Sequence, residues 1–208
     1  MVNDYRNTRH ESILSNVIGK KLALRDAINI DRPRIRNYYD CICDKKLSYC
    51  KNFSQIYNHK CCYCGISISI IDNSLFEIDH YIPKSTYIEI NEANYIDNLV
   101  YSCRYCNRNK SNYVIDEEHR IILHPDYDIY KAYYRDEQFN IRISDEYSKD
   151  EIISRFYFMM KFEAQYRRLD YLIMELLDFC NCNETESRIS PIYRILYKLI
   201  KCRNKILK

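Results

Sequence analysis

Apolar residues recur at helical spacing in the first part of the chain. Between about residues 10 and 27 they return every three or four positions, which predicts an amphipathic helix. Pro33 ends this pattern, because proline has no backbone N–H to donate to a helix. A second helix is predicted over residues 47–58. The apolar stripe of the first helix consists of Ile13, Leu14, Val17, Ile18 and Leu22.

Short runs of β-forming residues follow. Residues 66–71 and 75–78 are rich in β-forming residues, and Asp72-Asn73-Ser74 between them favours a turn, so the two runs predict a hairpin. Downstream of a polar loop, a strand is expected at residues 98–101 and a helix at 104–113. Further short strands are expected at residues 121–123 and 138–143.

The C-terminal part is expected to be helical. Ser148-Lys149-Asp150-Glu151 has the pattern of a capping box, and an apolar stripe with a period of 3.6 residues continues behind it to Leu177. A second helix is predicted to begin at Ser190-Pro191, with Cys180-Asn181-Cys182-Asn183 in the intervening turn. It should bury Ile192, Ile195, Leu196, Leu199 and Ile200.

Composition narrows the functional classes. The 208 residues include two glycines, so the glycine-rich phosphate loops and the nucleophile elbow of esterases are excluded. With neither a membrane-length apolar run nor the apolar stretch of a signal peptide, we expect a cytoplasmic protein. Thiols stay reduced in that compartment, so the eleven cysteines favour metal binding over disulfides. Residues 1–60 carry 12 Lys and Arg against 6 Asp and Glu, which suggests an anionic partner or a solvated basic face.

Two Cys-x-x-Cys pairs give the strongest chemical signal. Cys61 and Cys64 form one pair, and Cys103 and Cys106 form the other. Four thiolates at this spacing suit a structural zinc ion with no open coordination position. His59 is close enough to compete as a ligand.

The residues between and after these pairs resemble the HNH endonuclease family. The matching pattern covers about residues 60–112: Cys-x-x-Cys, Asp79-His80-x-x-Pro-Lys-Ser, Asn98-Leu-Val, and Cys-x-x-Cys-Asn107-x-x-Lys-Ser. The resemblance implies a ββα-metal finger and a nuclease that requires Mg²⁺ or Mn²⁺. It gives His80 the role of general base, Asp79 and Asn107 that of ligands of the divalent ion, and Asn98 that of bracing the loop. Many family members have histidine where this chain has Asn107, and oxygen donors there favour a hard ion.

The resemblance also implies an anionic substrate. Arg104 and Arg108 lie four positions apart on the expected helix and could hold phosphates, as could Lys110 and Lys84. DNA is the expected substrate, and RNA is a second possibility. A zinc-organised binding module without catalysis is the alternative. Residues 121–128 and the helical C-terminus resemble retron-associated and Septu-like defence proteins, which implies an anti-phage effector with an ATPase or retron partner. His124 is interpreted as a loop residue.

We therefore expect an α+β protein in three parts. Residues 1–58 form a basic, mainly helical segment, residues 59–115 form the HNH finger with its structural zinc, and residues 116–208 form short strands followed by a helical region. No function is assigned to the other seven cysteines, which are Cys41, Cys43, Cys50, Cys62, Cys180, Cys182 and Cys202.

Overall fold

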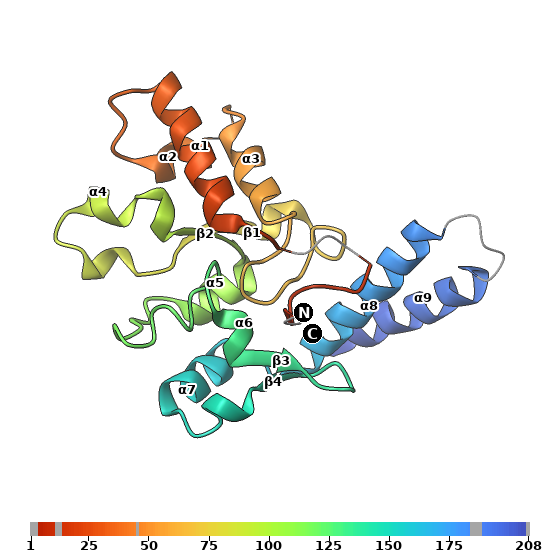
Figure 1. Ribbon diagram of the computed structural model, residues 1–208. Helices are drawn as coiled ribbons and strands as arrows, with labels where there is room; N and C mark the ends of the chain where they lie inside the picture. Colours follow the sequence, from red (N-terminus) through yellow and green to blue (C-terminus); the bar gives the residue numbers. More distant parts are fainter. Residues whose placement is uncertain (1–3, 11–13, 45, 184–188, 207–208) are drawn as a thin grey trace.

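The computed structural model describes residues 4–10, 14–44, 46–183 and 189–206 (Figure 1). The helices are α1 (Val17–Asp31), α2 (Tyr38–Cys43), α3 (Tyr49–Ile56), α4 (Ile90–Ala93), α5 (Arg104–Lys110), α6 (Ile129–Ala132), α7 (Glu151–Met159), α8 (Gln165–Cys182) and α9 (Ile189–Ile206). The strands are β1 (Phe76–His80), β2 (Leu99–Cys103), β3 (Tyr133–Arg135) and β4 (Ile141–Ile143).

Two antiparallel strands and a helix form the centre of the molecule. β1 pairs with β2 so that Asp79 lies opposite Val100 and His80 opposite Leu99. α5 follows β2 directly and packs against both strands. In Figure 1, α1, α2 and α3 lie on one side of this unit, and α8 and α9 project on the other. The structure is thus a mixture of helices and small sheets, as an α+β protein should be.

The predicted hairpin of residues 66–71 and 75–78 is wrong. Residues 68–70 form a turn, Ser67 makes an isolated bridge with Lys60, and β1 pairs with β2 instead. Isoleucine content indicates that a segment can be extended, but the partner of a strand depends on contacts far away in sequence. The strand expected at residues 121–123 is likewise a turn, whereas the one expected at 138–143 exists as β4 and pairs with β3.

The N-terminal helices are shifted relative to the prediction. α1 begins at Val17 rather than near residue 10, and it continues to Asp31, just before Arg32-Pro33. Its buried residues are Val17, Lys21, Leu24 and Ile28, and Ile13 of the predicted stripe lies outside the described residues. α3 falls within the helix predicted at residues 47–58, and α2 was not predicted.

The C-terminal helices also differ from the prediction. Asp150, not Ser148, caps α7, because its carboxylate accepts hydrogen bonds from the backbone N–H groups of Ile152 and Ile153. The predicted continuous stripe is interrupted between α7 and α8, where Lys161 adopts a left-handed backbone conformation. In α9 only Leu196 of the five expected core residues is buried, and Cys180 and Cys182 belong to α8 rather than to the turn.

A shared core extends across the three expected parts. It runs from Tyr5 to Phe162 and includes both cysteine pairs. Arg6 donates hydrogen bonds to the carbonyl oxygens of Cys62 and Pro125, so the N-terminal segment is buried against the centre of the molecule. A second, smaller cluster between α8 and α9 consists of Ile173, Cys180 and Leu196. In the described ranges, no helix combines the length and apolar character required to span a bilayer.

Candidate metal centre and nuclease site

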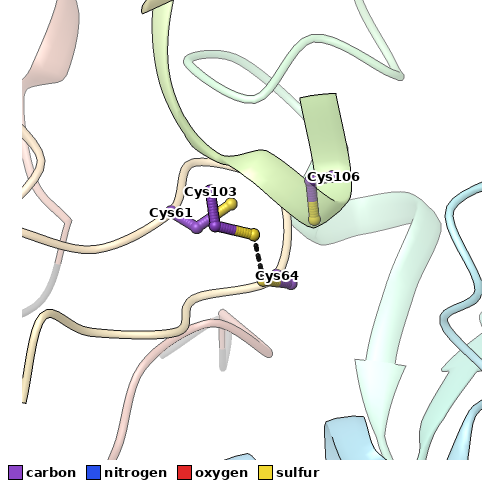
Figure 2. Close-up of side chains that lie close together, drawn as sticks. All are labelled: Cys61, Cys64, Cys103 and Cys106. Atoms are coloured by element: carbon purple, nitrogen blue, oxygen red, sulfur yellow. Dashed lines mark hydrogen bonds between the residues drawn. The ribbon is translucent and has the colours of Figure 1, made fainter. Parts of the chain in front are cut away.

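The four cysteines of the two Cys-x-x-Cys pairs come together in space (Figure 2). Cys61 and Cys64 lie on the loop before β1, Cys103 ends β2, and Cys106 lies in the first turn of α5. Their sulfur atoms all lie within 4.8 Å of one another, and all four residues are buried. Such a set of thiols could hold a zinc ion, because zinc prefers four sulfur ligands at the corners of a tetrahedron.

Gly65 shapes the first cysteine pair. Its backbone has a φ of +76°, and its N–H donates to the carbonyl of Cys61 at 2.9 Å, which closes the turn. A Cβ atom at this position would lie 2.4 Å from the carbonyl oxygen of Arg6. Glycine is therefore required both by the backbone conformation and by the close approach of the N-terminal segment.

The environment of the four thiols favours a metal-binding cluster. Burial raises the pKa of Cys61, but hydrogen bonds from Cys103, Cys106 and the other neighbouring thiols bring it well below its usual range. Burial and the hydrogen bonds with Cys103 instead raise the pKa values of Cys64 and Cys106 well above theirs, so the negative charge of the coupled thiols is placed on Cys61. The Nη2 atom of Arg167, a buried residue of α8, lies 3.2 Å from Cys106 Sγ. A guanidinium group at this position opposes the negative charge that four thiolates bring to a zinc ion, so the donor set and its surroundings both fit zinc.

The other candidate ligands lie elsewhere. Cys62 is buried but is not among the four clustered thiols. His59, which the sequence left open as a competing ligand, has its Nδ1 atom 3.1 Å from Ser54 Oγ and is also outside the cluster. The cysteines of the chain are free thiols rather than disulfides.

Asp79 is buried against α5 and the loop that carries Tyr63. Tyr63 donates its hydroxyl to Asp79 Oδ2 at 3.0 Å, and Lys110 Nζ lies 3.3 Å from Oδ1. Burial raises the pKa of Asp79 to about 6, although the charge of Lys110 and the Tyr63 hydrogen bond oppose this shift. The carboxylate is thus ionised at neutral pH and already has two partners.

His80 faces the opposite side of β1. Its Nε2 atom lies 2.9 Å from Asn94 Oδ1, and its ring packs against that of Tyr39 of α2, with 4.7 Å between ring centroids and an angle of 38° between the ring planes. An amide oxygen only accepts hydrogen bonds, so Nε2 carries the proton and Nδ1 keeps its lone pair. Burial lowers the pKa of His80 to about 4, helped by the charges of Lys84 and Lys110. The imidazole is therefore neutral at physiological pH.

Asn98 holds the loop between the two strands. Its Oδ1 atom accepts from the N–H of Ile82 at 2.8 Å, and its Nδ2 atom donates to the carbonyl oxygens of Ile82 and Ala93. The backbone of Tyr81 also donates to the carbonyl of Asn98. The side chain of Asn98 thus connects Ile82, two residues after His80, to Ala93 near the far end of the loop.

Asn107 is connected to β1 through Glu77, a residue for which the sequence predicted no role. Its Nδ2 atom donates to Glu77 Oε2 at 2.7 Å, and Arg104 donates to the other oxygen of Glu77 at the same distance. Glu77 and Asp79 are two positions apart on a strand, so both face α5. That period of two was the signal in the sequence that could have identified Glu77.

The expected nucleic-acid contacts fall into two groups. Lys84 and Arg108 are exposed, and Arg104 is partly exposed beside Glu77. Lys110 is 1% exposed, and its ammonium group donates to the carbonyl of His80 at 2.9 Å in addition to pairing with Asp79. The expectation that Lys110 contacts a phosphate is therefore corrected: its charge neutralises a buried carboxylate.

Other residues that contact the candidate site could not be predicted from the sequence. Asn94 lies in a polar loop with no apparent periodicity, and Arg167 is one of two adjacent arginines of α8. His124, interpreted as a loop residue, is buried between the rings of Tyr81 and Tyr127. Its Nδ1 atom accepts a hydrogen bond from the backbone N–H of Asp126.

One segment of the chain matches a known protein family. Residues 61–113 match the HNH endonuclease family, and this segment contains both cysteine pairs, β1, β2 and α5. No curated protein and no solved structure matches the chain. The HNH match suggests nuclease activity on nucleic acids, and HNH nucleases use divalent metals. The further resemblance to retron-associated and Septu-like defence proteins gains no support from these comparisons.

Proposed function

We propose that this protein is a metal-dependent HNH endonuclease that hydrolyses phosphodiester bonds of DNA. The observation that carries the proposal is the arrangement at the end of β1, where His80 and Asp79 are adjacent. α5 places Asn107 beside the acidic face of the same strand through Glu77. The family match covers all of these residues.

His80 is the proposed general base. Its neutral imidazole has a lone pair on Nδ1, because the hydrogen bond to Asn94 fixes the proton on Nε2. A base of this kind takes a proton from the water that attacks phosphorus. The ring of Tyr39 and the loop braced by Asn98 hold the imidazole in place.

Asp79 and Asn107 are the proposed ligands of the divalent ion. Together with Glu77 they offer carboxylate and amide oxygens, the donors that Mg²⁺ and Mn²⁺ prefer. A divalent ion held by these residues would supply positive charge to the scissile phosphate and the leaving oxygen. Asp79 and His80 face opposite sides of β1, and Asp79 is buried, so an ion held by Asp79 would have to displace Lys110 or Tyr63 from its carboxylate. The substrate phosphate is expected at the end of this strand, beside His80.

Cations on both faces of β1, with Arg104 beside Glu77 and Ser74 near the start of the strand, would position the substrate. Lys84 lies on the side of His80, with its ammonium group 4.3 Å from the centre of the Tyr39 ring. Arg104 and Arg108 lie on α5, the side of Asp79. Cations on both sides of the expected phosphate are suited to hold the flanking phosphates of a nucleic-acid strand.

The direct test is cleavage of plasmid DNA in Mg²⁺ or Mn²⁺ by the protein and by His80→Ala. Loss of a general base should lower the rate by a factor of about 10² to 10⁴. His10→Ala, which changes an exposed histidine outside the site, is the matched control and should cut normally. Equal cutting by His80→Ala and the unmodified protein would refute the role of His80. Parallel assays with RNA decide between the two substrates.

One observation favours a second candidate, a zinc-organised binding module without catalysis. Lys110 and Tyr63 already satisfy both oxygens of Asp79, as they would in a purely structural carboxylate. In that case the double variant Asp79→Ala, His80→Ala would bind nucleic acid as well as the unmodified protein does. Neither of the two proteins would cut DNA or RNA in Mg²⁺ or Mn²⁺.

A further inference from the structure

Helix α9 carries a stripe of cations on one face. Arg194, Lys198, Lys201 and Lys205 follow one another at intervals of four, three and four residues, and all four are exposed. At 3.6 residues per turn, this spacing places them within an arc of about 60° and over a length of about 16 Å. We refer to these four residues as the α9 cationic stripe.

The opposite face of α9 is occupied by α8. Leu196 is buried in the cluster with Ile173 and Cys180, and Ile192 and Leu199 pack against this cluster. Arg203 pairs with the buried Asp170 of α8. These contacts fix the rotation of α9 about its axis, so the cationic stripe points to solvent.

The charge of α9 contrasts with the chain before it. The sequence from residue 189 to residue 206 contains no Asp or Glu, whereas residues 61–188 hold 14 Lys and Arg against 23 Asp and Glu. Among the described residues, no carboxylate forms an ion pair with the stripe. The stripe is therefore a local concentration of uncompensated positive charge.

Two tyrosines border the stripe. Tyr193 is 55% exposed and Tyr197 is 60% exposed, and the ammonium group of Lys201 lies 4.5 Å from the centre of the Tyr197 ring. Cations interleaved with exposed aromatic rings are typical of surfaces that follow a nucleic-acid backbone and stack on bases. An anionic membrane is a poorer match, because a helix lying on a membrane inserts one continuous apolar face. Here α8 covers Ile192, Leu196 and Leu199, and the exposed Ile195 and Ile200 lie on opposite flanks of that covered face.

The stripe is connected to the candidate nuclease unit. Asp170, the partner of Arg203, lies one turn of α8 after Arg167, and Arg167 contacts Cys106 at the start of α5. The C-terminal end of α9 is thus the end held nearest to the cysteine cluster. In Figure 1, α9 extends from this end away from β1 and β2.

We propose that the α9 cationic stripe binds the phosphate backbone of a nucleic acid, outside the site of cleavage. This proposal rests on the nuclease function proposed above and adds a second surface by which the protein holds its substrate. The four cations of the stripe should therefore all contribute to the affinity for nucleic acid, through electrostatic contacts that weaken as the salt concentration rises.

Binding can be measured without cleavage. The full chain with His80→Ala serves as the background, and fluorescence anisotropy follows its binding to a labelled DNA duplex and to the corresponding single strand. The test variant adds Arg194→Gln, Lys198→Gln, Lys201→Gln and Lys205→Gln. The matched control adds four changes of the same kind at exposed cations elsewhere, outside the basic residues 1–60: Lys131→Gln, Lys149→Gln, Arg155→Gln and Lys161→Gln. Zinc content and thermal unfolding are compared first.

The test variant should bind DNA at least about 10-fold more weakly at about 0.1 M salt, and its plot of log affinity against log salt should be shallower by about 3 to 4. The control should keep most of its affinity and slope. The proposal is overturned if test and control variants bind alike, or if the background protein binds neither DNA form. It is also overturned if the stripe instead governs binding to phosphatidylserine vesicles. Because no step depends on cutting, these outcomes leave the nuclease proposal to its own assay.

Discussion

Arg167 of α8 donates a hydrogen bond from Nη2 to Cys106 Sγ over 3.2 Å, and the same nitrogen lies 3.1 Å from the carbonyl oxygen of Met160. This contact links the C-terminal helices to the cysteine cluster. It also places a buried positive charge against sulfur atoms that become negative when they bind a metal ion.

Arg167→Met should therefore weaken the cluster. Loss of a buried hydrogen bond to a charged partner costs about 2 to 3 kcal/mol, which corresponds to a decrease in Tm of about 5 to 10 °C for a chain of this size. Thermal unfolding of the zinc-loaded protein measures the change. Arg168→Met is the control, because the neighbouring arginine donates to the carbonyl of Gln138 at the surface and lies outside the cysteine cluster. Equal Tm values for the two variants would contradict the role of Arg167.

Substitution of a cluster cysteine should unfold the HNH segment rather than only slow catalysis. In a small zinc site, the free energy of metal binding is folding free energy, so Cys103→Ser is expected to lose both bound zinc and cooperative unfolding. Cys62→Ala is the matched control, because Cys62 is equally buried but lies outside the cluster. Zinc analysis should give one ion for the control and none for Cys103→Ser. Full zinc content in Cys103→Ser would count against the assignment.

Asn98→Ala should loosen the loop that follows His80. The substitution removes three hydrogen bonds to the backbone of Ile82 and Ala93, which is expected to cost about 2 to 4 kcal/mol in the free energy of unfolding. Urea unfolding measures this loss, and limited proteolysis should show cleavage within residues 81–98. The exposed Asn91, changed to alanine, should leave both measurements unchanged.

Asn94 should act through the tautomer of His80. Asn94→Ala removes the side-chain oxygen that accepts the hydrogen bond from His80, so the imidazole proton is no longer fixed on Nε2. We expect this variant to cleave about 10-fold more slowly while it retains DNA binding. Asn94→Asp places a negative charge beside the ring and should raise the pKa of His80 above about 4, which an NMR titration detects. An unchanged titration in Asn94→Asp would show that the two side chains do not interact in solution.

The buried His124 should make the protein less stable in acid. Burial lowers its pKa to about 4, with the charges of Lys21 and Arg6 adding to the effect, whereas an unfolded histidine has a pKa near 6.5. Below pH 6.5 the unfolded chain binds a proton that the folded protein does not. Stability from this group is therefore present above pH 6.5 and is lost as the pH falls toward 4, by up to about 3 kcal/mol.

His124→Asn keeps an acceptor for the N–H of Asp126 and removes the titration. Unfolding free energies at pH 7 and pH 5 should differ less in this variant than in the unmodified protein. The comparison between variants matters because Asp79, whose pKa is raised to about 6, changes stability in the opposite direction over the same range. If the two proteins show the same pH dependence, His124 is not the group responsible.

Local patterns explain which parts of the molecule could be predicted. β2 and α5 lie close to the expected segments because Asn98-Leu99-Val100 and the second cysteine pair define both positions. The isoleucine-rich residues 66–71 were misassigned because β1 finds its partner about 20 residues later, across a loop that Asn98 holds. Pairing of this kind depends on tertiary contacts that no local pattern contains.

The candidate site likewise contains residues that local sequence patterns predict and residues that depend on tertiary contacts. The four clustered cysteines could be identified from spacing alone, since each pair is local. Asn94 and Arg167 could not, because each reaches its partner only after the loop and α8 have folded onto the HNH segment. Lys110 was misinterpreted for a related reason: the sequence shows its charge but not that Asp79 lies beneath it.

The position of Arg6 imposes an order on folding during synthesis. Its guanidinium group bonds to the carbonyls of Cys62 and Pro125, and Arg135 bonds to the carbonyl of Tyr5. The segment that carries Tyr5 and Arg6 is therefore synthesised before Pro125 and Arg135, its partners more than a hundred residues later in the chain, and this interval lasts several seconds or more at about 5 to 20 residues per second. Until then the cysteine pairs lack their N-terminal cover, and their thiols are accessible to any metal ion or oxidant in the surrounding solution.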